Sequence, residues 1–296
     1  MLDTIAAVME NKPLTGGHFL LSLDAPEQAR TTRAGQFVMV RMLGRTDVIL
    51  RRPMSIYDVK PAPHLARGGR SGPGNRQQSP GEPGIIQLLY KEVGRGTRLM
   101  GALQPGGQVG LLGPLGHGFF EEEYLDEARQ VDEVVHVAGG IGIAALLLPA
   151  RDLARAGIRQ KLFFGGRTKD DLVGLEDFAA YVRDPVLATE DGSRGHKGYV
   201  TAPLEAYLEQ SRPRSRMMMV CGPWGMLRAA ARLSGRFGRR CLVSMENRMG
   251  CGLGVCLGCS IQVNGEGHGS YQRVCTEGPV FWSDQVVWEA EAIPKT

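Results

Sequence analysis

Four of the six cysteines gather near the end of the chain, in a pattern that leaves this segment little conformational freedom. Cys251, Cys256 and Cys259 follow the spacing Cys-x4-Cys-x2-Cys in MGCGLGVCLGCSI, and Cys275 comes after a polar, glycine-rich turn. Outside oxidising compartments, clustered cysteines are typical of metal or redox ligands. A loop that supplies three ligands has to fold around its centre while the fourth returns from a separate segment. We therefore expect a compact module here.

The spacing is that of the plant-type ligands of a [2Fe–2S] cluster. Gly250, Gly252, Gly254 and Gly258 allow the backbone to approach closely and to point N–H groups at the sulfurs, which stabilises negative charge and raises the reduction potential. Two alternatives stay open, a structural zinc site and inert free cysteines. Structural zinc usually shows two separated cysteine pairs, so the spacing and the glycine density favour iron and sulfur.

Length and charge set the wider limits. With 296 residues the chain is long enough for two domains, and its net charge of +4 comes from dispersed basic residues. This is typical of a solvated surface and not of a nucleic-acid footprint. No apolar run approaches the roughly 18–20 residues that span a bilayer, and the first residues lack the features of a signal peptide. We expect a cytoplasmic protein without membrane insertion.

The hydrophobic pattern changes once along the chain and predicts a multi-domain α and β protein. Residues 1–115 read as short strands such as HFLLSLDA and GQFVMVRML, and predict an antiparallel β-barrel or sandwich, with a mobile loop over 61–84. Residues 116–240 alternate strands with helices and predict a parallel sheet. Helices are expected in ALLLPARDLARAG, DDLVGLEDFAAYV and GMLRAAARLSGRFG. Residues 241–296 form the cysteine module.

Two glycine-rich turns follow strands of the expected parallel sheet. HVAGGIGIAALLL places Gly139, Gly140 and Gly142 between a strand and a helix, which is the context of a phosphate-binding turn. The strict G-x-G-x-x-G pattern is not met, so an ordinary tight turn remains the alternative. The second turn, Cys221–Pro223, would face the same crevice. Cys221 then lies against a nicotinamide or simply packs in the core.

Two stretches of the β domain suit a phosphate-bearing aromatic cofactor. Arg51–Ser55 combines arginines, whose guanidinium groups bind phosphate in a fork, with a rigid proline and a serine donor. Further on, the ring of Tyr90 can cover an aromatic group, and Gly96 and Thr97 open a short helix. Either stretch alone is usually ordinary surface. Their occurrence together, ahead of a dinucleotide-type domain, makes them more specific.

The motifs RRPMSI, GRGT, GPLGHGF, AGGIGIA, FFGGR, ATEDGSRGHKGYVT and CGPWGML occur in the order found in the ferredoxin–NADP reductase superfamily, which the chain resembles. The module SMENRMGCGLGVCLGCSI with RVCTEGPVF narrows this resemblance. It is similar to the electron-transfer subunits of the two-subunit, NAD-dependent (class 1B) dihydroorotate dehydrogenases. The match spans nearly the whole chain, and the cysteine motif is its most specific part.

The resemblance assigns the cofactor sites. It implies an N-terminal flavin-binding barrel, an NAD-binding α/β domain with NAD as co-substrate, and a [2Fe–2S] module. The residues implied for FAD are Arg52, Pro53, Met54, Ser55, Leu89, Tyr90 and Lys91, with Gly96 and Thr97 at its phosphates. Those implied for NAD are Gly139, Gly140, Gly142, Ile143, Ala144, Cys221, Gly222 and Pro223. The implied cluster ligands are Cys251, Cys256, Cys259 and Cys275.

The resemblance also implies the reaction and the partner. Electrons would pass from the FMN of a dihydroorotate-oxidising subunit to the cluster, then to FAD and NAD+, within pyrimidine biosynthesis and in a heterotetramer of two plus two subunits. The sequence shows no acid–base carboxylate pair and no Ser/His/Asp arrangement, so no catalytic residue is assigned and the chain should not oxidise dihydroorotate alone. Leu253, Val255 and Leu257 are expected either to meet the partner or to shield the cluster.

Rival functions and three departures from the family pattern remain. The same domains could serve an NAD(P)H-linked subunit of a ferredoxin, hydrogenase or sulfur-reducing complex, or a non-catalytic redox sensor. The loop 61–84 is longer than its hairpin needs, Ala145 replaces a frequent proline, and Glu277 replaces the more usual aspartate. Arg167 and Lys169 follow the second strand of the α/β domain and leave NADP open as an alternative to NAD.

Overall fold

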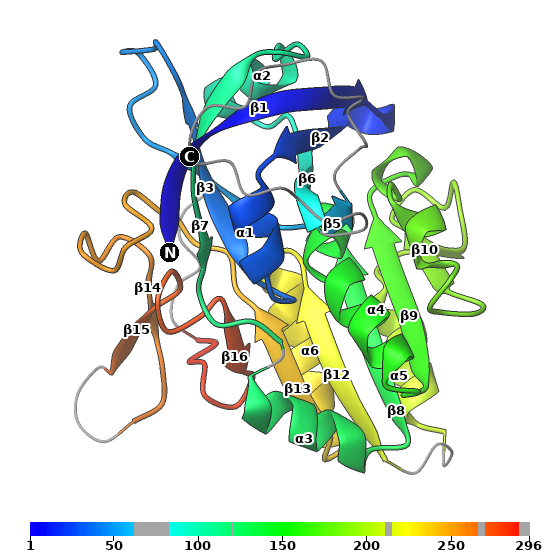
Figure 1. Cartoon of the computed structure of the whole chain (residues 1–296). Helices are drawn as coiled ribbons and strands as arrows, with labels where there is room; N and C mark the ends of the chain where they lie inside the picture. Colours follow the sequence, from blue (N-terminus) through cyan, green and yellow to red (C-terminus); the bar gives the residue numbers. More distant parts are fainter. Residues whose placement is uncertain (62–82, 120, 211–214, 266–269, 290–296) are drawn as a thin grey trace.

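Two seven-stranded sheets and a cysteine-bearing segment make up the computed structural model, which describes residues 1–61, 83–119, 121–210, 215–265 and 270–289 (Figure 1). Most of the expected mobile loop 61–84 lies outside the described residues. The first sheet occupies the top of Figure 1, the second the lower right, and the cysteine-bearing segment lies beside both.

The first sheet is antiparallel throughout, with the order β4-β3-β7-β1-β2-β6-β5. Its strands are β1 (Leu2–Pro13), β2 (His18–Asp24), β3 (Phe37–Met42), β4 (Arg52–Ser55), β5 (Asp58–Pro61), β6 (Pro83–Lys91) and β7 (Gln108–Leu115). A 3₁₀ turn over Thr15–Gly17 and the short helices α1 (Pro26–Thr31) and α2 (Arg95–Gly101) connect them. The expected antiparallel β domain is confirmed.

The two edges of this sheet, β4 and β5, are joined by only two residues, and these close it into a half-barrel. The amide of Ile56 donates to the Gln36 carbonyl at 3.0 Å, and the amide of Tyr57 donates to the Gln87 carbonyl at 2.9 Å. Both side chains are buried, so the crossing also fills the core. The residues before the crossing, Arg52–Ser55, are thereby fixed at the open end of the half-barrel.

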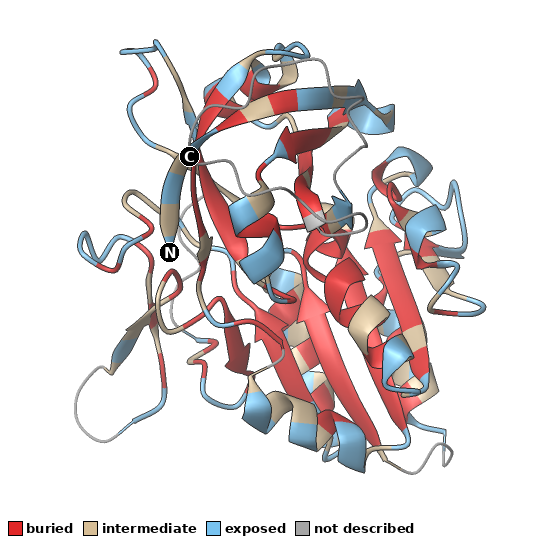
Figure 2. Ribbon diagram, in the orientation of Figure 1, coloured by how far each residue is buried: buried red, intermediate tan, exposed pale blue. Residues whose placement is uncertain are grey.

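The second sheet is parallel apart from its last strand, with the order β11-β10-β9-β8-β12-β13-β16. Its strands are β8 (Glu133–Gly139), β9 (Gln160–Gly166), β10 (Val186–Thr189), β11 (His196–Lys197), β12 (Arg216–Cys221), β13 (Arg240–Ser244) and β16 (Val280–Trp282). The helices α3 (Glu122–Gln130), α4 (Leu147–Arg155), α5 (Thr201–Leu208) and α6 (Trp224–Arg236) accompany them. Figure 2 shows the central strands buried along almost their whole length, as expected for a parallel sheet covered on both faces.

The helix expected in DDLVGLEDFAAYV is wrong. This stretch holds two 3₁₀ turns, Lys169–Asp171 and Leu175–Phe178, separated by Gly174 in the left-handed region at φ 75°. Contacts with the first sheet explain the difference. The Tyr57 hydroxyl lies 3.4 Å from the Gly174 carbonyl and also hydrogen-bonds Asp177, so packing between the sheets overrides the helical pattern.

The cysteine loop is held between two strands of the second sheet. It leaves β13, passes through the short antiparallel pair β14 (Ser260–Gln262) and β15 (Tyr271–Arg273), and returns as β16, which pairs antiparallel with β13. A domain boundary after residue 240 would fall inside β13. The expected divisions at 115 and 240 stay predictions.

Within the part of the chain that the structure describes, every helix falls short of the length and apolar character that a membrane crossing needs.

A buried ion pair ties the two central strands of the second sheet together. Glu133 on β8 stands in register with Arg216 on β12, and both side chains are almost fully buried. The Glu133 carboxylate also accepts a hydrogen bond from the Tyr207 hydroxyl at 2.5 Å and contacts Arg159 at 3.1 Å. Burying two charges costs desolvation energy that such contacts offset, so each partner depends on the other.

Replacing Glu133 with alanine should therefore destabilise the fold strongly. Glu133→Ala takes away the carboxylate beside a buried guanidinium, and we expect the free energy of unfolding to fall by about 3–5 kcal/mol. A urea titration followed by far-UV circular dichroism measures this. The exposed Glu122→Ala is the matched control, with an expected change within about 0.5 kcal/mol. Equal urea midpoints for the two variants would contradict a structural role for the pair.

Candidate functional site

A cavity of about 240 Å³ lies where the two sheets and the cysteine segment meet. The half-barrel, the glycine turn after β8 and the segment after β13 all contribute to its wall. The lining residues are Phe37, Pro53, Met54, Ser55, Leu89, Tyr90, Lys91, Val93, Thr97, Ile141, Ala144, Ser244, Met245, Glu246, Asn247, Met249 and Pro279. Seven of the residues proposed for FAD are thus brought together, from three separate stretches of sequence.

The first sheet fixes the polar groups at this cavity. Lys91, the last residue of β6, forms an ion pair with Asp171, which lies in the 3₁₀ turn after β9. Tyr90 lines the cavity, but its ring also stacks on Phe19 with centroids 5.4 Å apart, and its hydroxyl donates to Asn11 at 3.2 Å. Burial raises the pKa of Tyr90 to about 12, so its hydroxyl stays protonated at neutral pH.

Arg52 and Gly96 do not line the cavity, but they lie against each other beside Thr97, which does. A Cβ at Gly96 would lie 2.1 Å from the Arg52 Nε, so a side chain here would displace this guanidinium. One guanidinium nitrogen of Arg52 donates to the Leu50 carbonyl at 2.8 Å, and the rest of the guanidinium lies against Gly96. The neighbouring Arg51 turns away and forms a two-pronged ion pair with Asp3.

The two glycine turns of the second sheet are in direct contact, as their position after adjacent parallel strands predicts. A Cβ at Gly142 would lie 2.3 Å from the Cys221 carbonyl oxygen, and one at Gly222 would lie 2.9 Å from the Gly139 amide nitrogen. Gly142 and Gly222 are therefore required by the close approach of two backbones. The Cys221 thiol is buried and does not line the cavity, and burial raises its pKa.

Sequence reasoning assigned no role to several cavity residues. Phe37, Val93 and the segment Ser244–Asn247 all contribute to the wall, as do Met249 and Pro279. The segment follows β13 directly, so its position depends on the order of strands in the sheet, which the sequence does not state. The one signal in the sequence was that the segment follows a strand directly. The carboxyl end of a parallel strand faces the ligand side of such a sheet.

The four cysteines of the motif lie together in two pairs. The thiol of Cys251 contacts that of Cys256, and the thiol of Cys259 contacts that of Cys275. Among the residues that the structure describes, no three His, Cys, Asp or Glu side chains are grouped to hold one metal ion. The two pairs supply four thiolates, which is the number that a [2Fe–2S] centre takes.

Backbone amides point at the sulfurs, as the glycine-rich spacing predicts. The Leu253 amide donates to the Cys251 Sγ at 3.3 Å. Desolvation acts to raise the pKa of Cys251, but hydrogen bonds from the amides of Leu253, Cys256 and Val255 outweigh it and lower the pKa to about 6. These amides thus favour the thiolate form of Cys251, which is the form that binds iron.

The two thiol pairs differ in exposure. Cys256 is exposed and Cys251 half-buried, and Leu253, Val255 and Leu257 beside them are 43%, 79% and 63% exposed. Cys259 and Cys275 are both buried, and they share a hydrophobic core with Phe37 and Met39 of β3. The cysteine loop therefore connects the protein surface with the interior.

The cysteine loop also lies next to the cavity. A Cβ at Gly252 would lie 2.6 Å from the Met39 side chain, and Phe37, two residues along the same strand, lines the cavity. Alternate residues of a strand lie on one face about 7 Å apart. On the other side, Met249 of the loop itself contributes to the cavity wall. The thiols and the cavity are thus separated by a few side chains only.

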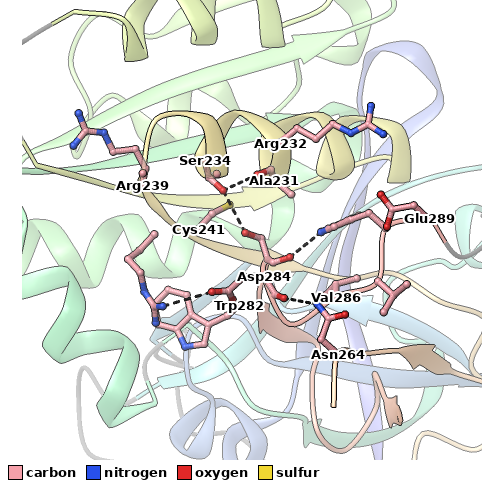
Figure 3. A pocket seen from close by; sticks show the side chains of 16 residues that line it. Ala231, Arg232, Ser234, Arg239, Cys241, Asn264, Trp282, Asp284, Val286 and Glu289 are labelled. Atoms are coloured by element: carbon pink, nitrogen blue, oxygen red, sulfur yellow. Dashed lines mark hydrogen bonds and ion pairs between the residues drawn. The ribbon is translucent and has the colours of Figure 1, made fainter. Parts of the chain in front are cut away.

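A larger cavity of about 370 Å³ lies elsewhere, between α6, β13 and the segment that follows β16 (Figure 3). Its wall contains Ser234, Cys241 and Trp282, and its polar groups bond one another. The Asn264 amide donates to the Asp284 carbonyl at 2.7 Å, and Arg240 lies over the Trp282 ring at 3.7 Å. Neither the glycine turns nor the cysteine motif contributes to this cavity, so we place the functional site at the smaller one.

Comparison with known proteins identifies two parts of the chain. Residues 246–287, which contain all four cysteines of the motif, match the iron–sulfur cluster binding domain of dihydroorotate dehydrogenase B. Residues 136–232 match an oxidoreductase NAD-binding domain. The electron-transfer subunit of dihydroorotate dehydrogenase B (NAD(+)) from Desulforamulus reducens is 35% identical over 92% of this chain and 93% of its own length. The corresponding subunit from Geobacillus thermodenitrificans is 34% identical over 95% and 96%.

The chain belongs to the family of dihydroorotate dehydrogenase B electron-transfer subunits. A solved structure agrees with the fold of this family. The NADH-dependent reduced ferredoxin–NADP oxidoreductase, described for flavin-based electron bifurcation, has a TM-score of 0.76 and 26% identity over 97% of this chain and 91% of that one. Family membership decides between the alternatives at the motif, because its iron–sulfur domain covers the two thiol pairs.

Removing one exposed thiol should empty the iron–sulfur site. Cys256→Ser replaces a thiolate with a hydroxyl that binds iron poorly, so we expect the purified protein to lose most of its iron, measured by elemental analysis and visible absorption. Cys241→Ser is the matched control. Cys241 is buried between Ser234 and Ser283, and burial raises its pKa to about 12, so its substitution should leave the iron content unchanged. Normal iron in Cys256→Ser would contradict the ligand set.

Proposed function

We propose that this chain carries electrons from a dihydroorotate-oxidising subunit that holds FMN, through a [2Fe–2S] cluster and FAD, to NAD+. Cys251, Cys256, Cys259 and Cys275 would hold the cluster, and FAD would occupy the cavity of about 240 Å³. When bound, these groups supply one-electron transfer and its conversion to the two-electron chemistry of a nicotinamide. The overall reaction removes two electrons and two protons from dihydroorotate and delivers a hydride to NAD+, releasing one proton.

The position of the cysteine loop carries the proposal. One thiol pair is at the surface beside exposed apolar side chains, and the other is buried next to Phe37, which lines the cavity. An electron donor that docks over the loop would thus meet the exposed thiols before it meets the cavity. A cluster of purely structural role would not need this connection between surface and cavity.

At the cavity, the residues of the half-barrel have separable tasks. The Arg52 guanidinium, placed against Gly96 and beside Thr97, is suited to bind phosphate oxygens in a fork. Pro53–Ser55 and Leu89–Lys91 form the wall against which the flavin would lie. Lys91 is held by Asp171, so the turn after β9 fixes a positive charge at this wall.

NAD+ would bind at the two touching glycine turns, over Gly139–Ala144 and near Cys221–Pro223. Ile141 and Ala144, which both belong to the first of these turns, support the placement because they line the cavity. A dinucleotide on the turns would therefore extend toward the flavin. The turn after β8, which is half-buried at Gly140 and Ile141, is suited to hold a pyrophosphate on its backbone amides.

The partner would dock over the exposed pair of thiols. Leu253, Val255 and Leu257 form an apolar surface there, which we call the cluster patch. Exposed apolar groups around a redox centre are typical of an interaction site. By family resemblance we propose an FMN-containing catalytic subunit, an assembly of two plus two subunits and a cytoplasmic location.

A ferredoxin-linked function is the second candidate. The bifurcating oxidoreductase that shares the fold over 97% of this chain is 26% identical, so a related electron-transfer role on another partner has structural support. The dihydroorotate dehydrogenase B subunits have the higher identity, 34–35% over more than nine-tenths of the chain.

Co-expression with a dihydroorotate dehydrogenase catalytic subunit distinguishes the two candidates. We expect the purified complex to contain FMN, FAD and iron, and to reduce NAD+ when dihydroorotate is added, while this chain alone does not. The measurement is the absorbance of NADH at 340 nm. A complex that forms but never passes electrons from dihydroorotate would refute the proposal, and reduction of ferredoxin by the same preparation would favour the second candidate.

Arg52 and Arg51 form a matched pair for the flavin site. Arg52→Ala removes charge-assisted hydrogen bonds to a phosphate, each worth about 1.5–3 kcal/mol, so FAD should bind about 10- to 100-fold more weakly. Arg51→Ala removes the same charge one residue earlier, where the side chain is engaged with Asp3, and should leave FAD binding nearly unchanged. Fluorescence titration of the deflavinated protein measures both. Equal affinities would argue against the placement of the flavin phosphates.

The cluster patch can be tested by introducing a charge. Val255→Asp places a carboxylate in the proposed interface, and we expect association with the catalytic subunit to weaken at least tenfold, or about 1.4 kcal/mol, while iron and FAD contents stay normal. Tyr199→Asp is the control, because Tyr199 is 70% exposed and follows β11 at the opposite edge of the sheet from β16. Unchanged association of Val255→Asp in analytical ultracentrifugation would remove the patch from the interface.

A further inference from the structure

An ion pair brackets Cys275. Arg273, the last residue of β15, precedes this cysteine by two positions, and Glu277 follows it by two. The Arg273 Nε donates to the Glu277 Oε2 at 2.9 Å, a second guanidinium nitrogen bonds Oε1, and the Arg273 backbone amide donates to Oε2 at 2.7 Å. Thr276 adds a hydroxyl hydrogen bond to Oε1 at 3.0 Å. The departure at Glu277 thus has a structural use, since its carboxylate holds the arginine in a fork.

The free side of the same guanidinium reaches the cysteine loop. Arg273 Nη1 donates to the Gly254 carbonyl at 2.9 Å, and the Gly254 amide donates toward the Cys275 sulfur. Both backbone groups of Gly254 are therefore engaged by the segment 273–275. Gly254 adopts φ 76°, and a Cβ there would lie 2.9 Å from the Thr276 methyl and 3.1 Å from Arg273 Nη1. Glycine is required for this close approach.

The charges of the pair also act on the buried thiols. A guanidinium and a carboxylate joined in a two-pronged fork are both ionised at neutral pH. The guanidinium is also in electrostatic contact with Cys275 and Cys259.

We propose that Arg273 is a positioning residue for the cluster: it fixes Gly254 so that the amide bonds Cys275, and its charge, opposed by that of Glu277, sets the reduction potential. The proposal rests on the ligand set proposed above. A reduced cluster carries one more negative charge than an oxidised one, and a nearby cation stabilises that charge. Glu277 weakens this effect. Loss of either charge should therefore move the potential, in opposite directions.

Two charge-removing variants of the full chain, purified with FAD and cluster bound, test this. In a redox titration followed by electron paramagnetic resonance, Glu277→Gln should raise the midpoint potential of the cluster and Arg273→Gln should lower it. Arg273→Gln should also lose iron to a chelator several-fold faster, because the Gly254 contact is weakened. Arg129→Gln is the control, since it removes the same charge from an exposed ion pair with Asp126 on α3 and should change neither quantity.

Opposite shifts of the midpoint potential support the proposal. A purely structural role would instead predict loss of the cluster, with no direction of the potential that follows the charge removed. Shifts of the same sign, or potentials equal to that of Arg129→Gln, overturn it. If Arg273→Gln retains no iron, the test rests on Glu277→Gln alone. An unchanged midpoint potential in that variant then refutes the proposal. These readouts do not involve dihydroorotate or a partner. A wrong physiological function therefore leaves them intact, whereas a wrong ligand set is revealed separately by normal iron in Cys256→Ser.

Discussion

The pairing of β16 with β13 is the interaction on which the arrangement of the sites depends. The chain leaves the second sheet after Ser244, and it rejoins the same sheet edge at Val280, where the two strands align residue for residue. The intervening segment is therefore a closed excursion with both ends fixed. Its first residues form part of the cavity wall, and its middle carries the cysteines against β3 of the half-barrel. One pair of strands thus sets both sites.

The resulting order of sites has a simple physical logic. A cysteine pair at the surface is accessible to another protein, and a buried pair next to β3 is close to the cavity but shielded from water. The cavity in turn borders the glycine turn after β8. Redox groups that must exchange electrons need short separations, whereas hydride chemistry needs a dry, shaped cavity. In this fold the cysteine loop keeps the separations short, and the junction of the two sheets forms the cavity.

Much of this could be predicted from the sequence, because the decisive residues occur in local patterns. The cysteine spacing, the turn at Gly139–Gly142 and the Arg52–Ser55 stretch each report chemistry through neighbours in sequence. What escaped prediction depends on packing between distant elements. The helix expected near Gly174 is broken by contacts with Tyr57, and Glu246 and Asn247 line the cavity only because β13 ends there. The role of Glu277 could not be predicted either, because it depends on the turn that brings Glu277 and Arg273 together beside Cys275.

The central claim is that electrons from outside the chain pass the cysteine loop before they reach the cavity. The most direct measurement is anaerobic stopped-flow absorbance on the complex with its catalytic subunit, comparing the natural chain with Cys256→Ser after FAD content has been matched. NADH should still reduce the FAD of the cluster-free complex, while dihydroorotate should reduce FMN but no longer FAD. Reduction of FAD by dihydroorotate at the natural rate without the cluster would contradict it.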